Sequence, residues 1–290
     1  MADKEAIKEA IQGKTILVTG GAGTLGKVVV KELLKLKPQS VRIYSRNEYQ
    51  QWEFAADLRQ ETFGFVDITK ARFLIGDIRD KDRLYRAMNG VDYVVHAAAM
   101  KHIDICAYNP IEAVQTNIMG SINVIDCAID NGVKNVIAIS SDKAVHPVNL
   151  YGASKLVMEK LMVEANVYGK TKFSLVRFGN IEDASGTVVE KWRKQHKDGV
   201  PLTITDKDMT RFWIAQPLAA EYVLGFLTTM EGGEIFVPKC LPDKIYDMCK
   251  RKYPDDQITF TGVRAGEKMH EMLISETEKV LDLGLYWVIK

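Results

Sequence analysis

Short apolar runs alternate with longer amphipathic stretches along the first 180 residues of the chain. The runs are rich in β-branched residues and apolar through most of their length, as strands buried on both faces of a parallel sheet are. We predict such strands over 15–19, 41–45, 71–76, 92–97, 135–140 and 172–178. Helical patterns lie between them, over 24–37, 47–61, 80–89, 110–131 and 151–167. This alternation predicts an α/β fold, a doubly wound parallel sheet with right-handed crossovers.

The rhythm changes after about residue 180. Brief strand candidates at 201–206, 234–239 and 257–262 are separated by helices, with Gly and Pro nearby. We therefore predict a first domain over 1–180 and a smaller α/β lobe over 181–290, interleaved with the first. Ligands of doubly wound folds bind beyond the carboxyl ends of the strands, so the lobe is expected to cover a substrate there.

Composition and charge narrow the class of partners. The 39 Lys and Arg nearly balance the 38 Asp and Glu, and a net charge of +1 gives no reason to expect nucleic acid. No apolar run approaches the length of a membrane span, and the charged N-terminal stretch 1–14 is not a signal peptide. The four cysteines form no C-x-x-C pair and indicate reduced thiols. We expect a cytoplasmic protein without a membrane partner.

Three glycines, Gly20, Gly23 and Gly26, directly follow the first predicted strand in the sequence TGGAGTLGK. The first permits a tight turn, the second lets backbone N–H groups approach a pyrophosphate, and the third lets the helix pack closely on the strand. The helix N-terminus adds partial positive charge. Because a strand precedes the glycines and a helix follows, we predict a Rossmann dinucleotide site at this loop, including Thr24 and Leu25.

The end of the second strand bears on the choice of cofactor. A site that prefers NAD usually has Asp or Glu there for the ribose 2′-hydroxyl, whereas Arg can pair with the 2′-phosphate of NADP. Here Ser45 and Arg46 occupy this place, and the nearest acid is Glu48. We predict NADP and leave NAD open. Further cofactor contacts are expected after the third and fourth strands, at Asp77, Ile78, Ala97, Ala98 and Ala99.

The segment SSDKAVHPVNLYGASK, at 140–155, carries the candidate chemistry. Tyr151 and Lys155 are spaced i, i+4 on a predicted helix, so they project from the same face. A Lys ammonium near a phenol lowers the pKa of the phenol, which can then remove a hydroxyl proton while hydride leaves the same carbon. The spacing is common on exposed helices, but with the glycine loop it predicts an oxidoreductase-type site in which both residues also contact the cofactor.

Together these motifs resemble those of the extended short-chain dehydrogenases/reductases. From about residue 13 to 274 the chain is similar to the soluble, C5-inverting UDP-N-acetylglucosamine 4,6-dehydratases of pseudaminic acid-type pathways. The likeness rests on TGGAGTLGK, IYSRNE, GDIRD, HAAAMKH, TNIMGSINVI, SSDKAVHPVNLYGASK, RFGN, PLTITDKDMTRFW, GGEIFVPK and RAGEKMHE. Sugar epimerases lack the Asp–Lys pair that precedes the Tyr, and hexose dehydratases have Asp–Glu in its place.

The resemblance implies a lyase that acts on UDP-N-acetylglucosamine and recycles its cofactor within one turnover. Tyr151 would take the 4-hydroxyl proton as C4 is oxidised, with Ser141 hydrogen-bonding the developing carbonyl. The ketone acidifies the C5 proton, which Lys143 would remove as a neutral amine whose pKa is lowered by burial and nearby cations. Asp142, kept protonated, would donate to the departing 6-hydroxyl. Hydride then returns to C6, and reprotonation of C5 from the opposite face inverts that centre.

The resemblance also implies substrate contacts outside this segment, at Lys101, Asn180, Arg211, Arg264 and Glu267. Arg suits bidentate binding of a diphosphate. After Asn180 the chain reads GNIEDASGTVVE where relatives commonly read GNVVGSRGSVIP. Glu182 and Asp183 add negative charge there, and Ser185 stands where an Arg is usual, so the nucleotide of the substrate stays open.

Three other expectations complete the sequence-based picture. His102 and His146 have no metal-ligand spacing, so we infer no metal. The apolar stretch 110–131 favours a homo-oligomer, as in many extended dehydrogenases. A nucleotide-sugar 4-epimerase, a retaining 4,6-dehydratase and a cofactor-sensing protein without activity remain the alternatives to an inverting dehydratase.

Overall fold

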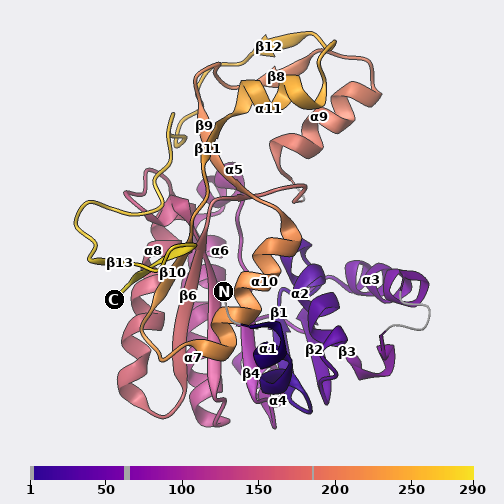
Figure 1. Cartoon of the computed structure of the whole chain (residues 1–290), viewed down its shortest axis with the longest axis vertical. Helices are drawn as coiled ribbons and strands as arrows, with labels where there is room; N and C mark the ends of the chain where they lie inside the picture. Colours follow the sequence, from indigo (N-terminus) through magenta and orange to yellow (C-terminus); the bar gives the residue numbers. More distant parts are fainter. Residues whose placement is uncertain (1–2, 62–65, 185) are drawn as a thin grey trace.

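A nine-stranded sheet forms the centre of the molecule in the computed structural model, which describes residues 3–61, 66–184 and 186–290 (Figure 1). The strand order is β13-β14-β10-β6-β5-β4-β1-β2-β3. These strands are β1 (Thr15–Thr19), β2 (Ser40–Ser45), β3 (Ala71–Ile75), β4 (Tyr93–His96), β5 (Asn135–Ser141), β6 (Lys172–Phe178), β10 (Ile235–Pro238), β13 (Val280–Asp282) and β14 (Tyr286–Ile289). All neighbours pair in parallel except β13 with β14 and β14 with β10. The predicted fold class and the first six strands are confirmed.

Helices cover both faces of this sheet. One face is packed by α1 (Lys4–Ile11), α2 (Thr24–Lys35), α3 (Glu48–Glu61) and α10 (Gln216–Thr229). The other is packed by α4 (Lys81–Met88), α7 (Gly120–Asp130) and α8 (Leu150–Glu164). The helices bury their apolar stripes against fully buried strand residues, and this burial is the main term that holds the layers together. Among the described residues, no helix is long and apolar enough to cross a membrane.

The helix predicted over 110–131 is interrupted. It consists of α6 (Pro110–Val114), a π-helical turn (Gln115–Met119) and α7, and it follows the short α5 (Ile103–Tyr108). Asn117 in the π turn accepts a hydrogen bond from the backbone N–H of Met100 at 2.8 Å and donates to Ser154 Oγ at 2.9 Å. The wider turn therefore carries a residue that ties the loop after β4 to α8.

A smaller lobe stands at the carboxyl ends of the central strands (Figure 1). It contains a three-stranded sheet, β11-β9-β7, and a two-stranded sheet, β12-β8. Its elements are β7 (Asn180–Ile181), α9 (Val188–Lys197), β8 (Leu202–Ile204), β9 (Thr210–Ile214), β11 (Pro242–Lys244), α11 (Ile245–Lys252) and β12 (Ile258–Phe260). A separate core around the fully buried Trp192 holds α9, α11 and β8 together.

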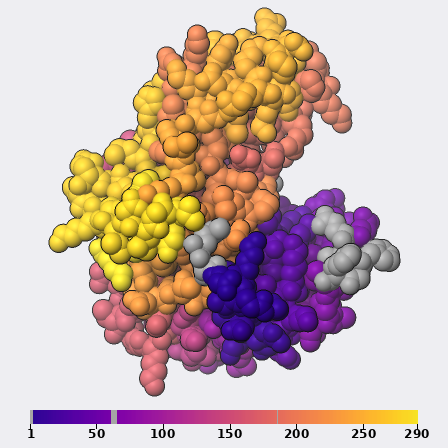
Figure 2. All heavy atoms as spheres, in the orientation of Figure 1, coloured from indigo at the N-terminus to yellow at the C-terminus, as the bar shows by residue number. Residues whose placement is uncertain are grey.

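One predicted strand of the lobe belongs elsewhere. The stretch 234–239 forms β10, which pairs in parallel with β6 in the large sheet. The preceding helix α10 also packs against that sheet. Its side chains are buried on both faces, which a small two-layer lobe could not provide. The C-terminal strands β13 and β14 likewise return to the large sheet, and the C-terminal segment, yellow in Figure 2, lies along its side.

Short 3-10 turns occur at Ile68–Lys70, Asp142–Ala144 and Ala165–Tyr168. The second of these turns begins directly where β5 ends, at the sheet edge that faces the smaller lobe. The carboxyl ends of parallel strands in doubly wound folds are the place where ligands bind. The fold therefore delivers the sequence-predicted catalytic segment to that place.

Candidate active site

The glycine-rich turn between β1 and α2 leaves no room for side chains. Gly20 has a φ of +67°, and a Cβ on it would lie 2.8 Å from the carbonyl carbon of Ala97. A Cβ on Gly26 would lie 2.3 Å from the carbonyl oxygen of Gly20. The backbone at the start of α2, from Thr24, can thus approach a ligand closely, and the helix N-terminus favours an anionic one. This cradle fits the pyrophosphate of a dinucleotide.

The ends of β2 and β3 lie beside this turn. Ser45 Oγ accepts a hydrogen bond from the backbone N–H of Ala22 at 3.0 Å, which ties β2 to the glycine turn. Arg46 Nη1 lies 3.7 Å from Asp77 Oδ2, and its side chain is 54% exposed. Asp77 also pairs with Arg79 at 2.7 Å, so its charge is already balanced. Arg46 is therefore a cation available at the surface next to the cradle.

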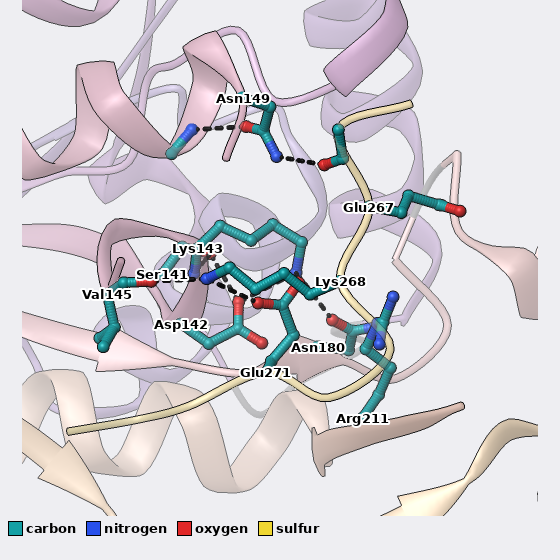
Figure 3. A network of polar contacts seen from close by, with 12 residues as sticks. Ser141, Asp142, Lys143, Val145, Asn149, Asn180, Arg211, Glu267, Lys268 and Glu271 are labelled. Carbon is teal, nitrogen blue, oxygen red and sulfur yellow. Dashed lines mark hydrogen bonds and ion pairs between the residues drawn. The ribbon is translucent and has the colours of Figure 1, made fainter. Parts of the chain in front are cut away.

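The segment that leaves β5 forms a compact polar cluster (Figure 3). Ser141 Oγ donates to Asp142 Oδ1 at 2.9 Å and accepts from the backbone N–H of Lys143 at 3.2 Å. Lys143 Nζ donates to the same Asp142 oxygen at 2.9 Å. Asp142 is fully buried, and its Oδ2 has no hydrogen-bond partner among the described residues. Burial without a partner is costly for a carboxylate oxygen, so Oδ2 is suited to a substrate hydroxyl.

Close packing of α8 on this turn brings Tyr151 into the cluster. Asn149 caps the helix, since its Oδ1 accepts from Gly152 N at 2.8 Å. A Cβ on Gly152 would lie 2.2 Å from the carbonyl oxygen of Lys143, so only glycine permits this approach. The phenol of Tyr151 lies close to Ser141 and Lys143, both of which favour its ionised form. Four of the five predicted catalytic residues thus lie in one polar cluster.

The electrostatics of Tyr151 differ from the sequence-based expectation. Burial raises the pKa of Tyr151 above its ordinary value, although Lys143 and Ser141 act in the opposite direction. The predicted lowering is therefore wrong for the protein alone, and the cation that favours the phenolate is Lys143. Lys155 donates to the carbonyl oxygen of Ile139 at 2.8 Å. Burial lowers the pKa of Lys155 to about 8, so this side chain stays mostly charged at neutral pH.

The predicted depression of the pKa of Lys143 is also wrong. Burial lowers the pKa of Lys143, but the carboxylates of Asp142 and Glu271 outweigh it and leave the pKa above its ordinary value. Glu271 Oε1 lies 3.6 Å from Lys143 Nζ. Glu271 lies 128 residues further along the chain, so no local sequence pattern indicates that this second carboxylate lies beside Lys143.

Two residues of the site escaped the sequence-based prediction. Glu271, only 7% exposed, contacts Lys143, and its Oε2 lies 3.4 Å from Lys268 Nζ. Lys268 in turn donates to the carbonyl oxygen of Val145 at 2.6 Å. Both belong to the RAGEKMHE motif, in which the sequence-based prediction named only Arg264 and Glu267, as contacts of the substrate diphosphate and ribose.

Comparison with known proteins agrees with this geometry. Residues 16–286 match the family described as polysaccharide biosynthesis protein. The chain belongs to this family. Its resemblance to the inverting dehydratases, expected from the sequence, is confirmed. A UDP-N-acetylglucosamine 4,6-dehydratase (inverting) of Campylobacter jejuni subsp. jejuni serotype O:2 is 46% identical over 273 residues, which cover 92% of this chain and 79% of that protein.

The chain is also similar to an epimerase sequence and to a further solved structure. A UDP-glucose 4-epimerase of Rickettsia bellii strain RML369-C is 39% identical over 289 residues, covering 95% of this chain and 82% of that protein. The crystal structure of Pen from Bacillus thuringiensis superposes with a TM-score of 0.91 at 37% identity, covering 96% of this chain and 90% of that one. The chain is thus similar in sequence both to a dehydratase and to an epimerase, and similar in fold to Pen.

The residues expected to bind the substrate lie in two different places in the structure. Asn180 Oδ1 lies 3.5 Å from Lys143 Nζ, and the buried Arg211 lies near it on the adjoining strand β9 (Figure 3). Arg264 lies at the rim instead, where it pairs with Glu267 and, at 3.2 Å, with Asp104. The structure therefore brings the first two to the cluster.

Lys101 lies on the loop after β4, where burial of its ammonium lowers the pKa of Lys101 and Glu190 acts in the opposite direction. Asp183, in the divergent loop, pairs with Arg193 of α9 at 2.6 Å, so its charge is balanced within the lobe. Ser185 lies outside the described residues. In the part of the chain that the structure describes, no group of three or more His, Cys, Asp or Glu is placed to hold a metal ion.

Proposed function

We propose that this chain is a C5-inverting UDP-N-acetylglucosamine 4,6-dehydratase that uses NADP. The observation that carries the proposal is the single cluster of Ser141, Asp142, Lys143 and Tyr151 at the end of β5. A 4-epimerase needs the phenol and the cofactor but no adjacent acid and base. The identity to the Campylobacter jejuni dehydratase is also higher than that to the Rickettsia bellii epimerase.

The glycine cradle supports a nicotinamide dinucleotide, because added Cβ atoms would fill the space that its backbone keeps open. Gly20, Gly23 and the N-terminus of α2 would hold the pyrophosphate, and Arg46 would hold a 2′-phosphate. A bound oxidised nicotinamide supplies a hydride acceptor for C4, a hydride donor for C6 and a positive charge in the site. The exposed guanidinium of Arg46 is what favours NADP over NAD.

Tyr151 and Ser141 act at the 4-hydroxyl. Tyr151 removes its proton, for which Lys143 and Ser141 favour the phenolate against the effect of burial. Ser141 can also hydrogen-bond the developing carbonyl oxygen. This step makes the C5 proton acidic, because the anion left at C5 delocalises into the ketone.

Asp142 and Lys143 then carry out the elimination. One proton lies in the hydrogen bond from Lys143 Nζ to Asp142 Oδ1. Its movement to Asp142 turns the ion pair into a neutral amine and a neutral acid, the two forms that elimination requires. Lys143 takes the C5 proton, Asp142 donates its proton to O6, water leaves, and the pair returns to its ionic form. With a hydride supplied at C6, a proton from solvent would be added to C5 from the face opposite Lys143, which would give the inverted product.

We also propose a homo-oligomer. Large apolar side chains are exposed on the neighbouring helices α5, α6 and α8: Tyr108 is 86% exposed, Ile111 73% and Val157 40%. A surface of this kind on adjacent helices fits a second copy of the chain. Light scattering after size-exclusion chromatography tests this: a monomer at micromolar concentration would overturn it.

Incubation with UDP-N-acetylglucosamine in D2O, followed by NMR, tests the proposed activity. A 4-keto-6-deoxy product with deuterium at an inverted C5 is expected. A retained C5 configuration would identify a retaining dehydratase, and a 4-epimer that keeps its 6-hydroxyl would identify an epimerase. Tight NADP binding without any turnover would favour the cofactor-sensing alternative.

A further inference from the structure

The RAGEKMHE segment crosses the catalytic turn and binds it at two points. Glu271 Oε1 lies 3.6 Å from Lys143 Nζ, and Glu271 Oε2 lies 3.4 Å from Lys268 Nζ. Lys268 Nζ donates to the carbonyl oxygen of Val145, two residues after Lys143, at 2.6 Å. In Figure 3 the side chains of Lys143, Lys268 and Glu271 converge from these two segments. Charges of alternating sign thus run from Asp142 through Lys143 and Glu271 to Lys268.

We propose that Glu271 and Lys268 are positioning residues for Lys143: together they fix where its amine points and the pH at which it gives up its proton. Glu271 does not donate or accept a proton in the reaction in this scheme. The inference rests on the role of Lys143 as the base at C5, and it adds a counter-charge pair that the catalytic motif itself does not contain.

Burial strengthens the electrostatic interaction of Glu271 and Lys268 with Lys143. The side chains of Lys143, Lys268 and Glu271 are 16%, 17% and 3% exposed. Ion pairs at such sites are screened far less by water and salt than surface pairs are. Glu271 Oε2 accepts no hydrogen bond among the described residues, so no hydrogen-bond donor offsets the negative charge at this oxygen.

Removing the charge of Glu271 and removing that of Lys268 should shift the pKa of Lys143 in opposite directions. The charged and titratable groups that face Lys143 are Asp142, Tyr151 and Glu271, and Lys268 faces Glu271. Removing the negative charge of Glu271 makes the protonated amine less favourable. Removing the positive charge of Lys268 leaves Glu271 with Lys143 as its single cation, so the protonated amine becomes more favourable. Distortion of the site would not produce opposite shifts.

Glu271→Gln and Lys268→Met test this, with Glu276→Gln as the matched control. Glu276 lies five residues after Glu271, its side chain is 72% exposed, and it pairs with His146 rather than with Lys143. We expect the pH optimum of product formation to move down by roughly one unit in Glu271→Gln and up by a similar amount in Lys268→Met. kcat at each optimum should fall by about tenfold or more, with KM little changed.

A second measurement does not depend on the activity. The Lys143 ammonium can be titrated by NMR in ¹⁵N-lysine-labelled protein, with its signal assigned by its loss in Lys143→Ala. It should lose its proton at lower pH in Glu271→Gln, at higher pH in Lys268→Met and at the wild-type pH in Glu276→Gln. If the wild type forms no 4-keto product, the proposed function fails, while these titrations still decide the inference.

Circular dichroism and NADP binding show whether each variant is folded. If Glu271→Gln does not fold, Lys268→Met and its upward shift decide alone. Titration curves of folded variants that coincide with the wild type, or that shift in the same direction, would overturn the proposal.

Discussion

The backbone of Gly152 rests directly on the carbonyl oxygen of Lys143, so that a Cβ at residue 152 would lie 2.2 Å from this oxygen. This approach joins the helix that carries Tyr151 to the turn that carries Asp142 and Lys143. A distance so far below a van der Waals contact cannot be accommodated without moving one of the two segments. The relative position of base and phenol therefore depends on a residue that has no side chain.

Gly152→Ala should accordingly lower both activity and stability. An alanine usually stabilises a helix relative to glycine, by about 1 kcal/mol, but here overpacking should reverse the sign and destabilise the fold by about 1–3 kcal/mol. kcat should drop at least tenfold because Tyr151 is displaced from Ser141. Urea unfolding and steady-state kinetics measure the two effects.

Gly169→Ala is the matched control for this variant. A Cβ there would have its nearest neighbour, Ile129 Cγ2, at 4.0 Å. It should leave kcat unchanged. If Gly152→Ala behaves like this control, the close approach does not position the site.

Lys143→Ala should separate the two halves of the reaction. Oxidation of C4 needs Tyr151, whereas removal of the C5 proton needs Lys143, so the variant should still form reduced cofactor while 4-keto-6-deoxy product falls by about 10²–10⁴-fold. Reduced cofactor should form more slowly than in the wild type, because Tyr151 loses the cation that favours its phenolate. Stopped-flow absorbance of the reduced nicotinamide and NMR of the product record both steps.

Tyr151→Phe is the contrasting variant, and it should suppress reduced cofactor as well. Full product formation by Lys143→Ala, or deuterium exchange at C5 at the wild-type rate, would show that another group is the base.

Arg46→Ala should weaken binding of NADP and leave binding of NAD nearly unchanged. A charge-assisted contact with the 2′-phosphate is worth about 1.5–3 kcal/mol, or roughly ten- to a hundredfold in Kd. Isothermal titration calorimetry with both dinucleotides gives the ratio. Arg86→Ala, on the exposed face of α4, removes the same charge and should change neither Kd. Equal losses of both dinucleotides in Arg46→Ala would argue against a 2′-phosphate contact.

His96 should make the fold sensitive to mild acid. Burial, with a smaller contribution from Lys155, lowers the pKa of His96 to about 3, and its ring lies between Thr19 Oγ1 at 2.7 Å and Ser121 Oγ at 3.1 Å. The folded protein thus keeps the ring neutral while the unfolded chain protonates it near pH 6.5. The stabilisation is complete above that pH and is lost progressively as pH falls toward 3.

Between pH 7 and pH 5 this loss amounts to about 2 kcal/mol of the free energy of unfolding. Urea unfolding at the two pH values should show it in the wild type. In His96→Gln the difference between the two pH values should be about 2 kcal/mol smaller, because the carboxylates contribute equally to both proteins. An unchanged difference would mean that His96 does not stay neutral in the fold.

The local pattern of apolar and polar residues was enough to predict many of the strands and helices. The strands over 15–19 and 172–178 have the predicted bounds, because a buried parallel strand is apolar through most of its length and ends where turn residues begin. It failed for 234–239, since a short apolar run does not say which sheet it joins. It also missed the π turn at Gln115–Met119, whose sequence has no local signature of the contact that Asn117 makes with Met100.

Residues a few positions apart were enough to predict the glycine cradle, the helix that aligns Tyr151 with Lys155, and the Asp–Lys pair that precedes them. The electrostatic surroundings of that pair depend instead on the folded chain. Burial lowers the pKa of Lys143, but Asp142 and Glu271 outweigh it and raise the pKa above its ordinary value, and Glu271 reaches Lys143 from a segment far along the chain. Electrostatic energy depends on distance in space and on burial, which neighbouring letters of the sequence do not record.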